Sequence, residues 1–486
     1  MGAWHTTQKF SMVVSVQGAK SALCIFILAL AIEVLYMVPY GLTSSFRPLL
    51  SEAFGLSNRD IGKMSSVYGI VSMCCYFPGG YIADRFRPKW LMVSALLTTA
   101  ACCCYLLTGP SFTELVLIWA LLAAVGTLFF WSAFVSFIRQ TGGKEHSGKA
   151  FGFEQASRGV ASVLMTFALA AWMRQVMPAH AEATPHEKTQ AMTMLLKRLA
   201  MLEVVMAFVI MFALPSGMAP HVDELSAASA PGQVHQQKEA SKAVSTILDI
   251  LGRPVVWLHA LIVVAAYSGN LATHYFSGLA TCGYAMDVVQ AAEISSLVKG
   301  MRAWSGLVAG AAADRWGRSR ICCGLFLAYS CAYSWVALMP VDSHHPSMLM
   351  AQIAAAAASV FAIAGVYFTL LDDARLPLEL TGSAVGIISV VGFTPDIFMG
   401  QISGYWLDTY PGTRGYQYFY LFMAGVGLAG FLMTLAFALV VGKCGGQGSP
   451  SDLGSNPDLH TASCPDSSSS ASAEEDSAST VSESSV

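Results

Sequence analysis

Long apolar runs alternate with short polar segments along the chain up to about residue 442. Six runs precede the middle of the chain and six follow it, near residues 21–43, 60–83, 90–108, 112–138, 148–172, 194–214, 254–278, 290–313, 321–340, 346–371, 382–405 and 417–441. About 20 helical residues cross the hydrocarbon of a bilayer, so this many runs cannot all be the core of a soluble domain. Open sheets and loops are excluded there, because each unpaired backbone group would cost several kcal/mol. The pattern predicts an all-α membrane protein with twelve transmembrane helices.

The polar segments predict how these helices are grouped. A stretch rich in Ala, Ser, Gln and charge separates the first six runs from the last six. The predicted parts are a cytoplasmic segment 1–20, an N-terminal six-helix half 21–214, a cytoplasmic linker 215–253, a C-terminal six-helix half 254–442 and a tail 443–486. From Gly445 the tail is rich in Ser and acidic residues and lacks Lys and Arg, a composition that predicts disorder.

The first apolar run is expected to be retained as a transmembrane helix. It extends from Ser21 to about Thr43, which is too long for the apolar region of a signal peptide. It also contains Glu33 and lacks a small-residue cleavage site. An uncleaved first span is therefore predicted.

Composition and charge agree with a membrane location. Only 12% of the residues are charged and 55% are apolar, whereas about a quarter of a soluble chain is charged. With both termini in the cytoplasm, the inside segments hold about 16 Lys and Arg and the outside segments about 8. The positive-inside rule favours this orientation, and an even number of spans puts both termini on one side. We expect an integral, multi-pass protein of a bacterial inner membrane.

Enzyme, metal and nucleic-acid functions find little support. Most of the 12 cysteines lie inside apolar runs, and the spacings C-x-x-C and H-x-x-x-H are absent, so no metal or other cofactor is expected. A Walker phosphate loop, a nucleophile elbow and a metalloprotease motif are absent as well. Basic clusters are short and lie in loops, which argues against nucleic-acid binding. The expected partners are a small-molecule substrate and the lipid bilayer.

A six-residue pattern occurs twice, at corresponding places in the two predicted halves. After the second run the sequence has the pattern G-x-x-x-D-R, with Gly80, Asp84 and Arg85. The pattern returns after the eighth run with Gly310, Asp314 and Arg315, and Gly317 and Arg318 lie just beyond it. A small residue lets two helices approach closely, and an aspartate at a helix end can accept backbone hydrogen bonds or pair with an arginine. Parallel repeats of six spans are typical of two-half transporters, so these residues are predicted to gate the cytoplasmic face.

The repeated pattern resembles the cytoplasmic loop signature of the Major Facilitator Superfamily, and the resemblance covers about residues 20–442. The first copy departs from the family pattern, because Arg87 replaces the usual glycine and Pro88 replaces a basic residue. The resemblance implies a secondary transporter that is a monomer. Two further stretches, which begin at Gly148 and Gly382, resemble a little-characterised bacterial branch and point broadly towards organic anions.

Ionisable and aromatic residues inside the predicted spans are candidates for the substrate path. An ionisable residue within the bilayer costs several kcal/mol, so each is a functional candidate by default. Pairs three or four residues apart share one face of a helix. The candidates that meet these conditions are Glu33, Tyr36 and Tyr40 on the first span, Glu154 and Arg158 on the fifth, Asn270 and His274 on the seventh, Lys299 and Arg302 on the eighth, and Asp396 on the eleventh.

Two interpretations of these residues remain open. In the first, Arg158, Lys299 and Arg302 bind an anionic solute, because arginine can grip a carboxylate or phosphate with two hydrogen bonds. Glu33, Glu154 or Asp396 would then carry a proton, because a desolvated carboxyl group can load and release one near neutral pH. In the second interpretation, Glu154 and Arg158 only neutralise each other.

The predicted function is secondary active transport of a small organic anion by alternating access, coupled to protons or to exchange with a second anion. An alternative is a carrier of sugars or other neutral metabolites, for which the three cationic residues would have to be internally compensated. An alternative of another class is a membrane sensor that keeps the fold but does not transport.

Overall fold

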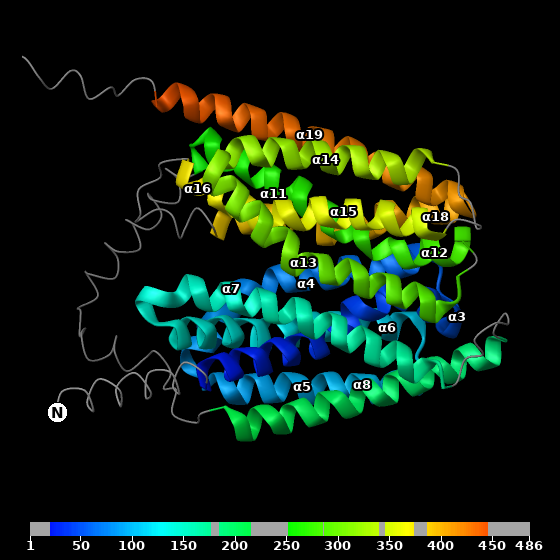
Figure 1. Ribbon diagram of the computed structural model, residues 1–486. Coiled ribbons are helices and arrows are strands. Elements are labelled where there is room, and N and C mark those ends of the chain that lie inside the picture. The colour runs from blue at the N-terminus through cyan, green and yellow to red at the C-terminus, as the bar shows by residue number, and fades with distance from the viewer. Residues whose placement is uncertain are drawn as a thin grey trace, which may run out of the picture. The chain divides into compact units, whose positions relative to one another are not determined.

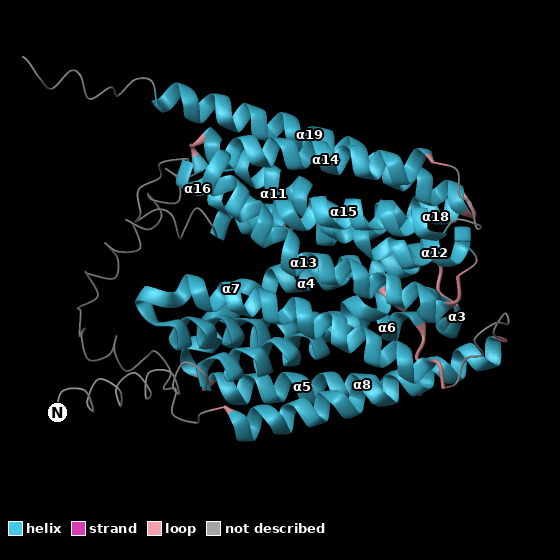
Figure 2. Cartoon of the chain, in the orientation of Figure 1, coloured by secondary structure: helices cyan, strands magenta, loops and turns pink. Residues whose placement is uncertain are grey.

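The computed structural model describes residues 20–175, 184–214, 251–284, 286–339, 346–373 and 386–445. Within these residues all regular structure is helical and no strand occurs (Figure 2), as the all-α prediction requires. The chain divides into two units, Met1–Val441 and Gly442–Val486, and the helices discussed below belong to the first. The predicted segments 1–20, 215–253 and 443–486 lie almost wholly outside the described residues.

The N-terminal helices begin with a helix over residues 20–36 that continues into a π-helical segment. The elements in order are η1 Met37–Gly41, α2 Leu42–Ser44, α3 Arg47–Phe54, α4 Asn58–Arg85, α5 Pro88–Leu106, α6 Phe112–Val125, η2 Gly126–Trp131, α7 Ser132–Met173 and α8 Pro185–Ala213.

The C-terminal helices follow, and several of them are interrupted. The elements are α11 Pro254–Ala272, η3 Thr273–Tyr275, α12 Phe276–Tyr284, α13 Val288–Trp316, α14 Arg318–Leu338, α15 Pro346–Val366, η4 Tyr367–Thr369, α16 Leu370–Asp373, a helix over 386–392, α18 Pro395–Thr409 and α19 Thr413–Gly445. The long helices lie side by side, with α3 and α12 towards one end and α16 at the other (Figure 1). These are called the α3 end and the α16 end below.

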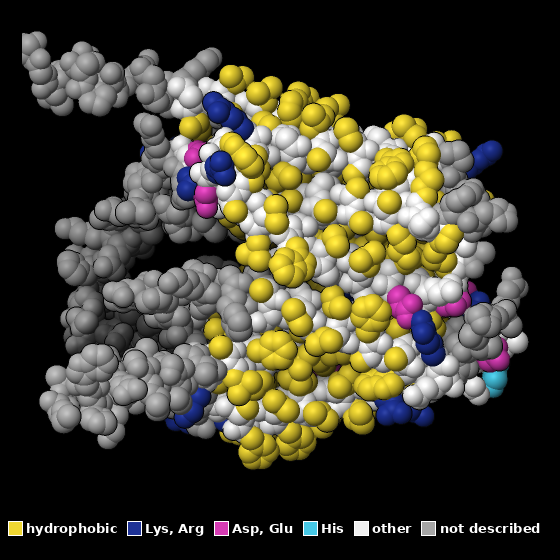
Figure 3. Space-filling view, in the orientation of Figure 1, with side chains coloured by type: hydrophobic (Ala, Val, Ile, Leu, Met, Phe, Trp, Pro, Cys, Tyr) yellow, Lys and Arg dark blue, Asp and Glu magenta, His cyan; other side chains and the backbone are white. Residues whose placement is uncertain are grey.

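The described helices have the length and surface of membrane spans. Among the described residues, nine segments are long and apolar enough to cross a bilayer by length and composition. The other three predicted spans correspond to α4, α8 and α13, which have 28, 29 and 29 residues and are long enough but more polar. On the face in Figure 3, charged side chains gather near the two ends and hydrophobic side chains cover the length between them. The count of twelve spans stays a prediction.

Two boundaries differ from those expected. The sixth span was predicted to begin near residue 194, but α8 begins at Pro185, because Thr184 and Glu187 form a capping box and Pro185 occupies the first turn. The fourth and fifth spans were predicted to be separated near residues 139–147. They are separate candidate spans, Phe112–Ile138 and Ala156–Met173, but helical structure continues between them as α7. No proline interrupts residues 132–173, and glycines lower helix stability without ending a helix.

Buried apolar side chains form two large clusters. The first contains residues 25–214 together with three residues from the start of α13, and the second contains residues 262–437. In the first cluster α5 packs against α8, and in the second α15 packs against α13 and α14. The clusters are joined by contacts of α4 with α18 and of α7 with α13.

Helices α4 and α18 touch through their backbones. A Cβ atom on Gly62 would lie 2.2 Å from the carbonyl oxygen of Gly400, and a Cβ on Gly404 would lie 2.7 Å from the carbonyl oxygen of Asn58. At the α3 end the carboxylate of Asp408 accepts hydrogen bonds from the backbone N–H groups of Asn58 (3.1 Å) and Arg59 (2.8 Å). Side chains larger than hydrogen are therefore excluded along this contact, and the start of α4 is capped by the end of α18.

We expect Gly62→Val to separate α4 from α18 and to lower the free energy of unfolding by about 1–3 kcal/mol, the usual effect of overpacking. Thermal unfolding in detergent micelles would measure this change. Gly425→Val is the matched control, because Gly425 is helical and exposed and a Cβ there meets no atom within 4 Å. Equal melting temperatures for the two variants would contradict the close contact.

Candidate functional site

Three interruptions in the helices lie next to the candidate site. The first span changes to π-helix at Met37–Gly41, which contains Pro39, and the seventh changes to a 3-10 turn at Thr273–Tyr275. The eleventh breaks at a turn over residues 393–394, after which Pro395 begins α18. Such interruptions frequently occur at functional sites. They place Tyr40, His274 and Asp396 around one cavity.

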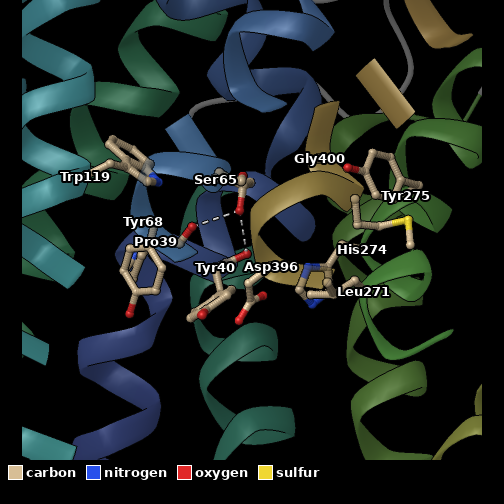
Figure 4. Close-up of a pocket in the computed structure, with 12 residues that line it drawn as sticks. Pro39, Tyr40, Ser65, Tyr68, Trp119, Leu271, His274, Tyr275, Asp396 and Gly400 are labelled. Atoms are coloured by element: carbon tan, nitrogen blue, oxygen red, sulfur yellow. Dashed lines mark hydrogen bonds between the residues drawn. The ribbon is translucent and has the colours of Figure 1, made fainter. Parts of the chain in front are cut away.

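This cavity of about 40 Å³ lies between the N-terminal and C-terminal helices. Its lining residues are Pro39, Tyr40, Thr43, Ser65, Tyr68, Trp119, Leu271, His274, Tyr275, Asp396, Met399 and Gly400. Figure 4 shows Asp396 between Tyr40 and His274, with Tyr68 beyond Tyr40. The Tyr40 ring makes edge contacts with Tyr68 and His274, at centroid distances of 5.0 and 6.2 Å. The cavity is thus small and aromatic, with one carboxyl group in its wall.

Asp396 is fixed by contacts on two sides. The hydroxyl of Tyr267 donates a hydrogen bond to its Oδ2 atom over 2.9 Å. On the other side, a Cβ on Gly69 of α4 would lie 2.8 Å from the Cβ of Asp396. Asp396 therefore sits at the inner end of the α4–α18 contact, where a movement of α18 would reach it directly.

A cluster of charged residues lies next to the cavity and begins at Glu33, one helical turn before Tyr36. Arg158 Nε donates to Glu33 Oε1 over 2.8 Å and lies 3.8 Å from Glu154 Oε1. The side chains of Arg158 and Glu33 are 10% and 12% exposed, so this is a desolvated ion pair. The expected partner of Arg158, Glu154, lies beside it, but Glu33, which was not predicted to pair with Arg158, is nearer. This ion pair ties the first span to α7.

Lys299 and Arg302 complete the cluster from α13. The ammonium group of Lys299 donates to the hydroxyls of Ser45 and Thr166, each over 3.3 Å, and no carboxylate pairs with it among the described residues. The charges of both Lys299 and Arg302 act on Glu33, and Arg302 also interacts with Arg158. Three cationic and two acidic side chains thus interact in one place, which leaves one positive charge in excess.

Tyr36 links the charged cluster to the cavity. Its ring contacts that of Tyr40 at 5.6 Å, and it interacts electrostatically with Arg158 on one side and Asp396 on the other. The structure therefore brings together all but one of the predicted substrate and proton residues. The exception is Asn270, which does not line the cavity. Its carbonyl accepts from the Thr273 hydroxyl at 2.7 Å, where the 3-10 turn breaks the spacing between Asn270 and His274.

The predicted gating residues lie at the α16 end. Arg85 is exposed over the ring of Tyr81, and Asp314 is exposed; the burial of Gly80 and of the Asp84 side chain is outside the described part. A Cβ on Gly310 would meet no atom within 4 Å, whereas Gly317 has φ 96° and joins α13 to α14. Arg315 packs over the ring of Trp316, and Arg318 pairs with Asp373 at 3.3 Å. A gating role for these residues stays a prediction.

Several buried polar residues escaped the sequence analysis. Glu203 is fully buried in α8, and neither of its carboxylate oxygens has a hydrogen-bond partner among the described residues. An acid inside the predicted sixth span was a signal for it. Arg47 is 3% exposed just beyond the first span, where only the neighbouring Pro48 marks the start of a helix. Tyr68 and Trp119 carry no charge, and nothing in the sequence separates them from other buried aromatic residues.

Comparison with known proteins identifies the family. The model of the Major Facilitator Superfamily matches residues 22–398. The chain belongs to the Major Facilitator Superfamily. The inner membrane proteins YqcE and YihN of Escherichia coli (strain K12) are 24% identical over 396 residues and 23% identical over 408. These alignments cover 81% and 82% of this chain, and 88% and 91% of the two relatives.

Solved structures of Major Facilitator transporters share the fold. The nucleoside transporter NupG matches with a TM-score of 0.63 at 12% identity, over 86% of this chain and 98% of that one. A bacterial homologue of the human lysosomal transporter Spinster matches with a TM-score of 0.61 at 14% identity, over 88% and 97%. The protein is therefore an integral, multi-pass membrane transporter and not an enzyme, as predicted.

We expect Arg158→Gln to destabilise this Major Facilitator protein by about 3–5 kcal/mol, because two carboxylates would lose the cation between them. A double-mutant cycle in detergent micelles should give Arg158 a coupling energy of about 1–3 kcal/mol with Glu33 and a smaller one with Glu154. The cycle uses Glu33→Gln and Glu154→Gln, each alone and with Arg158→Gln. A larger coupling to Glu154 would contradict the distances.

Proposed function

We propose that the protein is a secondary active transporter of a small organic anion that works by alternating access. It would consist of two six-helix halves, twelve spans in all, act as a monomer and keep both termini in the cytoplasm of a bacterial-type inner membrane. Membership of the family and the likeness to two inner membrane proteins support the general activity. The substrate class rests on the charges in the centre of the molecule.

The observation that supports an anionic substrate is the excess of positive charge beside the cavity. Glu33 and Glu154 flank Arg158, while Lys299 makes its hydrogen bonds to hydroxyls only. A desolvated cation that forms no ion pair with a carboxylate is costly in a bilayer and is a functional candidate for that reason. Lys299 and Arg302 would hold the carboxylate or phosphate group, and the Glu33–Arg158 pair would set the charge around them. Lys299 is thus favoured over Arg158 as the direct ligand.

Asp396 is the proposed proton carrier. It lines the cavity, receives a hydrogen bond from Tyr267 and begins the helix that packs against α4. Loading a proton there would neutralise a carboxylate at the contact between the N-terminal and C-terminal helices. The same site would then connect substrate binding to movement of α18.

The proposed orientation assigns a state to the structure. With cytoplasmic termini, the α3 end faces outwards, and there α4 meets α18 and Arg174 of α7 pairs with Glu293 of α13. Both contacts close the outer end, so under this orientation the structure is not in the outward-open state. The Spinster homologue to which the chain is similar is described as inward-facing.

A neutral solute is the second candidate. NupG, which shares the fold, is named as a nucleoside transporter, and Arg158 is compensated by two carboxylates. Trp119 also lines the cavity, and its buried indole N–H has no hydrogen-bond partner among the described residues. Such a donor suits a neutral polar group.

The substrate class can be tested by uptake into proteoliposomes of labelled lactate, succinate, gluconate, glucose 6-phosphate, glucose and uridine, with and without an inward proton gradient. We expect an anion to accumulate, and Lys299→Gln to lower kcat/KM for it about 10- to 100-fold, because a charged hydrogen bond is lost. The control is Lys63→Gln, which removes an exposed lysine whose partner is Asp60. Transport of glucose or uridine alone would favour the neutral carrier.

Proton coupling can be tested with Asp396→Asn. The amide keeps the shape of the carboxyl group but cannot take up a proton. We expect accumulation driven by a proton gradient to disappear while exchange of labelled for unlabelled anion across the membrane continues. Measurements of both rates on the same liposomes supply the comparison, and gradient-driven accumulation at the wild-type rate would rule out Asp396 as the carrier.

A further inference from the structure

Arg47 is a buried cation that neither the charged cluster nor the cavity wall contains. It begins α3 and is 3% exposed. Its guanidinium group donates to Asn58 Oδ1 from Nε (3.3 Å) and Nη2 (3.1 Å), and to the carbonyl of Thr43 from Nη1 (3.4 Å). It also lies 4.6 Å from the ring centre of Tyr275.

All these partners are neutral. No acidic side chain pairs with Arg47 in the described part of the chain. Three of the five guanidinium N–H groups are engaged, and two remain for another acceptor. A buried arginine usually has a carboxylate or phosphate beside it, because removing its charge from water costs several kcal/mol. The lack of such a partner in this state suggests that an anion meets Arg47 in another state.

Arg47 lies directly behind the wall of the cavity. Two of its three partners, Thr43 and Tyr275, line the cavity themselves. The charge of Arg47 also acts on His274, a third lining residue. The aromatic ring of Tyr275 therefore covers the guanidinium group on the cavity side.

Tyr275, which covers Arg47, belongs to the C-terminal helices, whereas Arg47 belongs to the N-terminal ones. Tyr275 ends the 3-10 turn η3, and its hydroxyl is hydrogen-bonded to Ser403 of α18. Arg47 is held by Thr43 and by Asn58, at the start of α4. If α18 separates from α4, Tyr275 leaves with Ser403 while Arg47 keeps its other partners.

We propose that Arg47 is a second anion-binding residue, which receives the carboxylate or phosphate group of the substrate when the α3 end is open. This inference rests on the proposed transport of an organic anion. In the open state the guanidinium group faces the entrance and draws the anion in. Closure then brings Tyr275 back over Arg47, and the anion passes to Lys299, whose partner Ser45 lies two residues before Arg47. The anion is thus bound by Arg47 while the α3 end is open and by Lys299 after that end has closed.

The test measures transport of the fastest anion of the uptake panel in right-side-out and inside-out vesicles. We expect Arg47→Gln to raise KM about tenfold for entry from the α3 side. Entry from the α16 side should stay within twofold of the wild type. Arg198→Gln is the matched control, because Arg198 also covers an aromatic ring, that of Trp172, at 5.3 Å, but does not line the cavity. Equal changes on both sides would mean a structural role and overturn the proposal.

A second measurement does not depend on transport by an Arg47 variant. Phenylglyoxal modifies accessible arginines, and mass spectrometry reports the modified positions. Tyr275→Ala should increase modification of Arg47 severalfold, and the panel anion should protect it, whereas inorganic chloride at equal ionic strength should not. Absence of protection would overturn the proposal. If the wild-type protein moves no anion of the panel, the proposed function fails instead, and the two failures remain distinct.

Discussion

The backbone contact between α4 and α18 is the constraint on which the site depends. Gly62, Gly400 and Gly404 let the helices approach until carbonyl oxygens face Cα atoms, and no larger side chain fits between them. This approach sets Asp396 against Gly69 and within reach of Tyr267. Asp408 then caps α4 at the far end of the same contact. A single helix pair therefore places the carboxyl group in the cavity wall and closes the end beyond it.

The second constraint is the cost of charge in an apolar interior. The charge of Arg158 is compensated by Glu33 and Glu154, and the Arg158–Glu33 ion pair connects the first span to α7. Lys299 and Arg47 are also desolvated, but they donate hydrogen bonds only to neutral acceptors. Stability alone would favour apolar residues at these two positions. Both of these cations lie where the N-terminal and C-terminal helices meet.

Periodicity and composition were enough to predict the class, and the repeated G-x-x-x-D-R pattern was enough to predict the family. Glu33, Arg158 and Lys299 stand out because ionisable groups are rare inside apolar runs. The glycines of α4 and α18 could not be paired from the sequence, since nothing local says which helix each one meets. Asn270 does not line the cavity that His274 lines, and the 3-10 turn that begins at Thr273 changes the helical spacing between the two residues. Arg47 lay just outside a predicted span, so its burial depends on long-range packing that composition does not encode.

The π-helical segment Met37–Gly41 gives the first span a phase shift. A π turn holds one more residue than an α turn, so everything beyond it is rotated by about 100° relative to an uninterrupted α-helix. Conversion of this segment to regular α-helix without a change of length would turn Thr43, which follows it, away from its present position relative to Glu33. The alignment of the charged cluster with the cavity therefore depends on the type of helix between Glu33 and Thr43. A substitution that removes the π turn can change this alignment without removing any polar side chain.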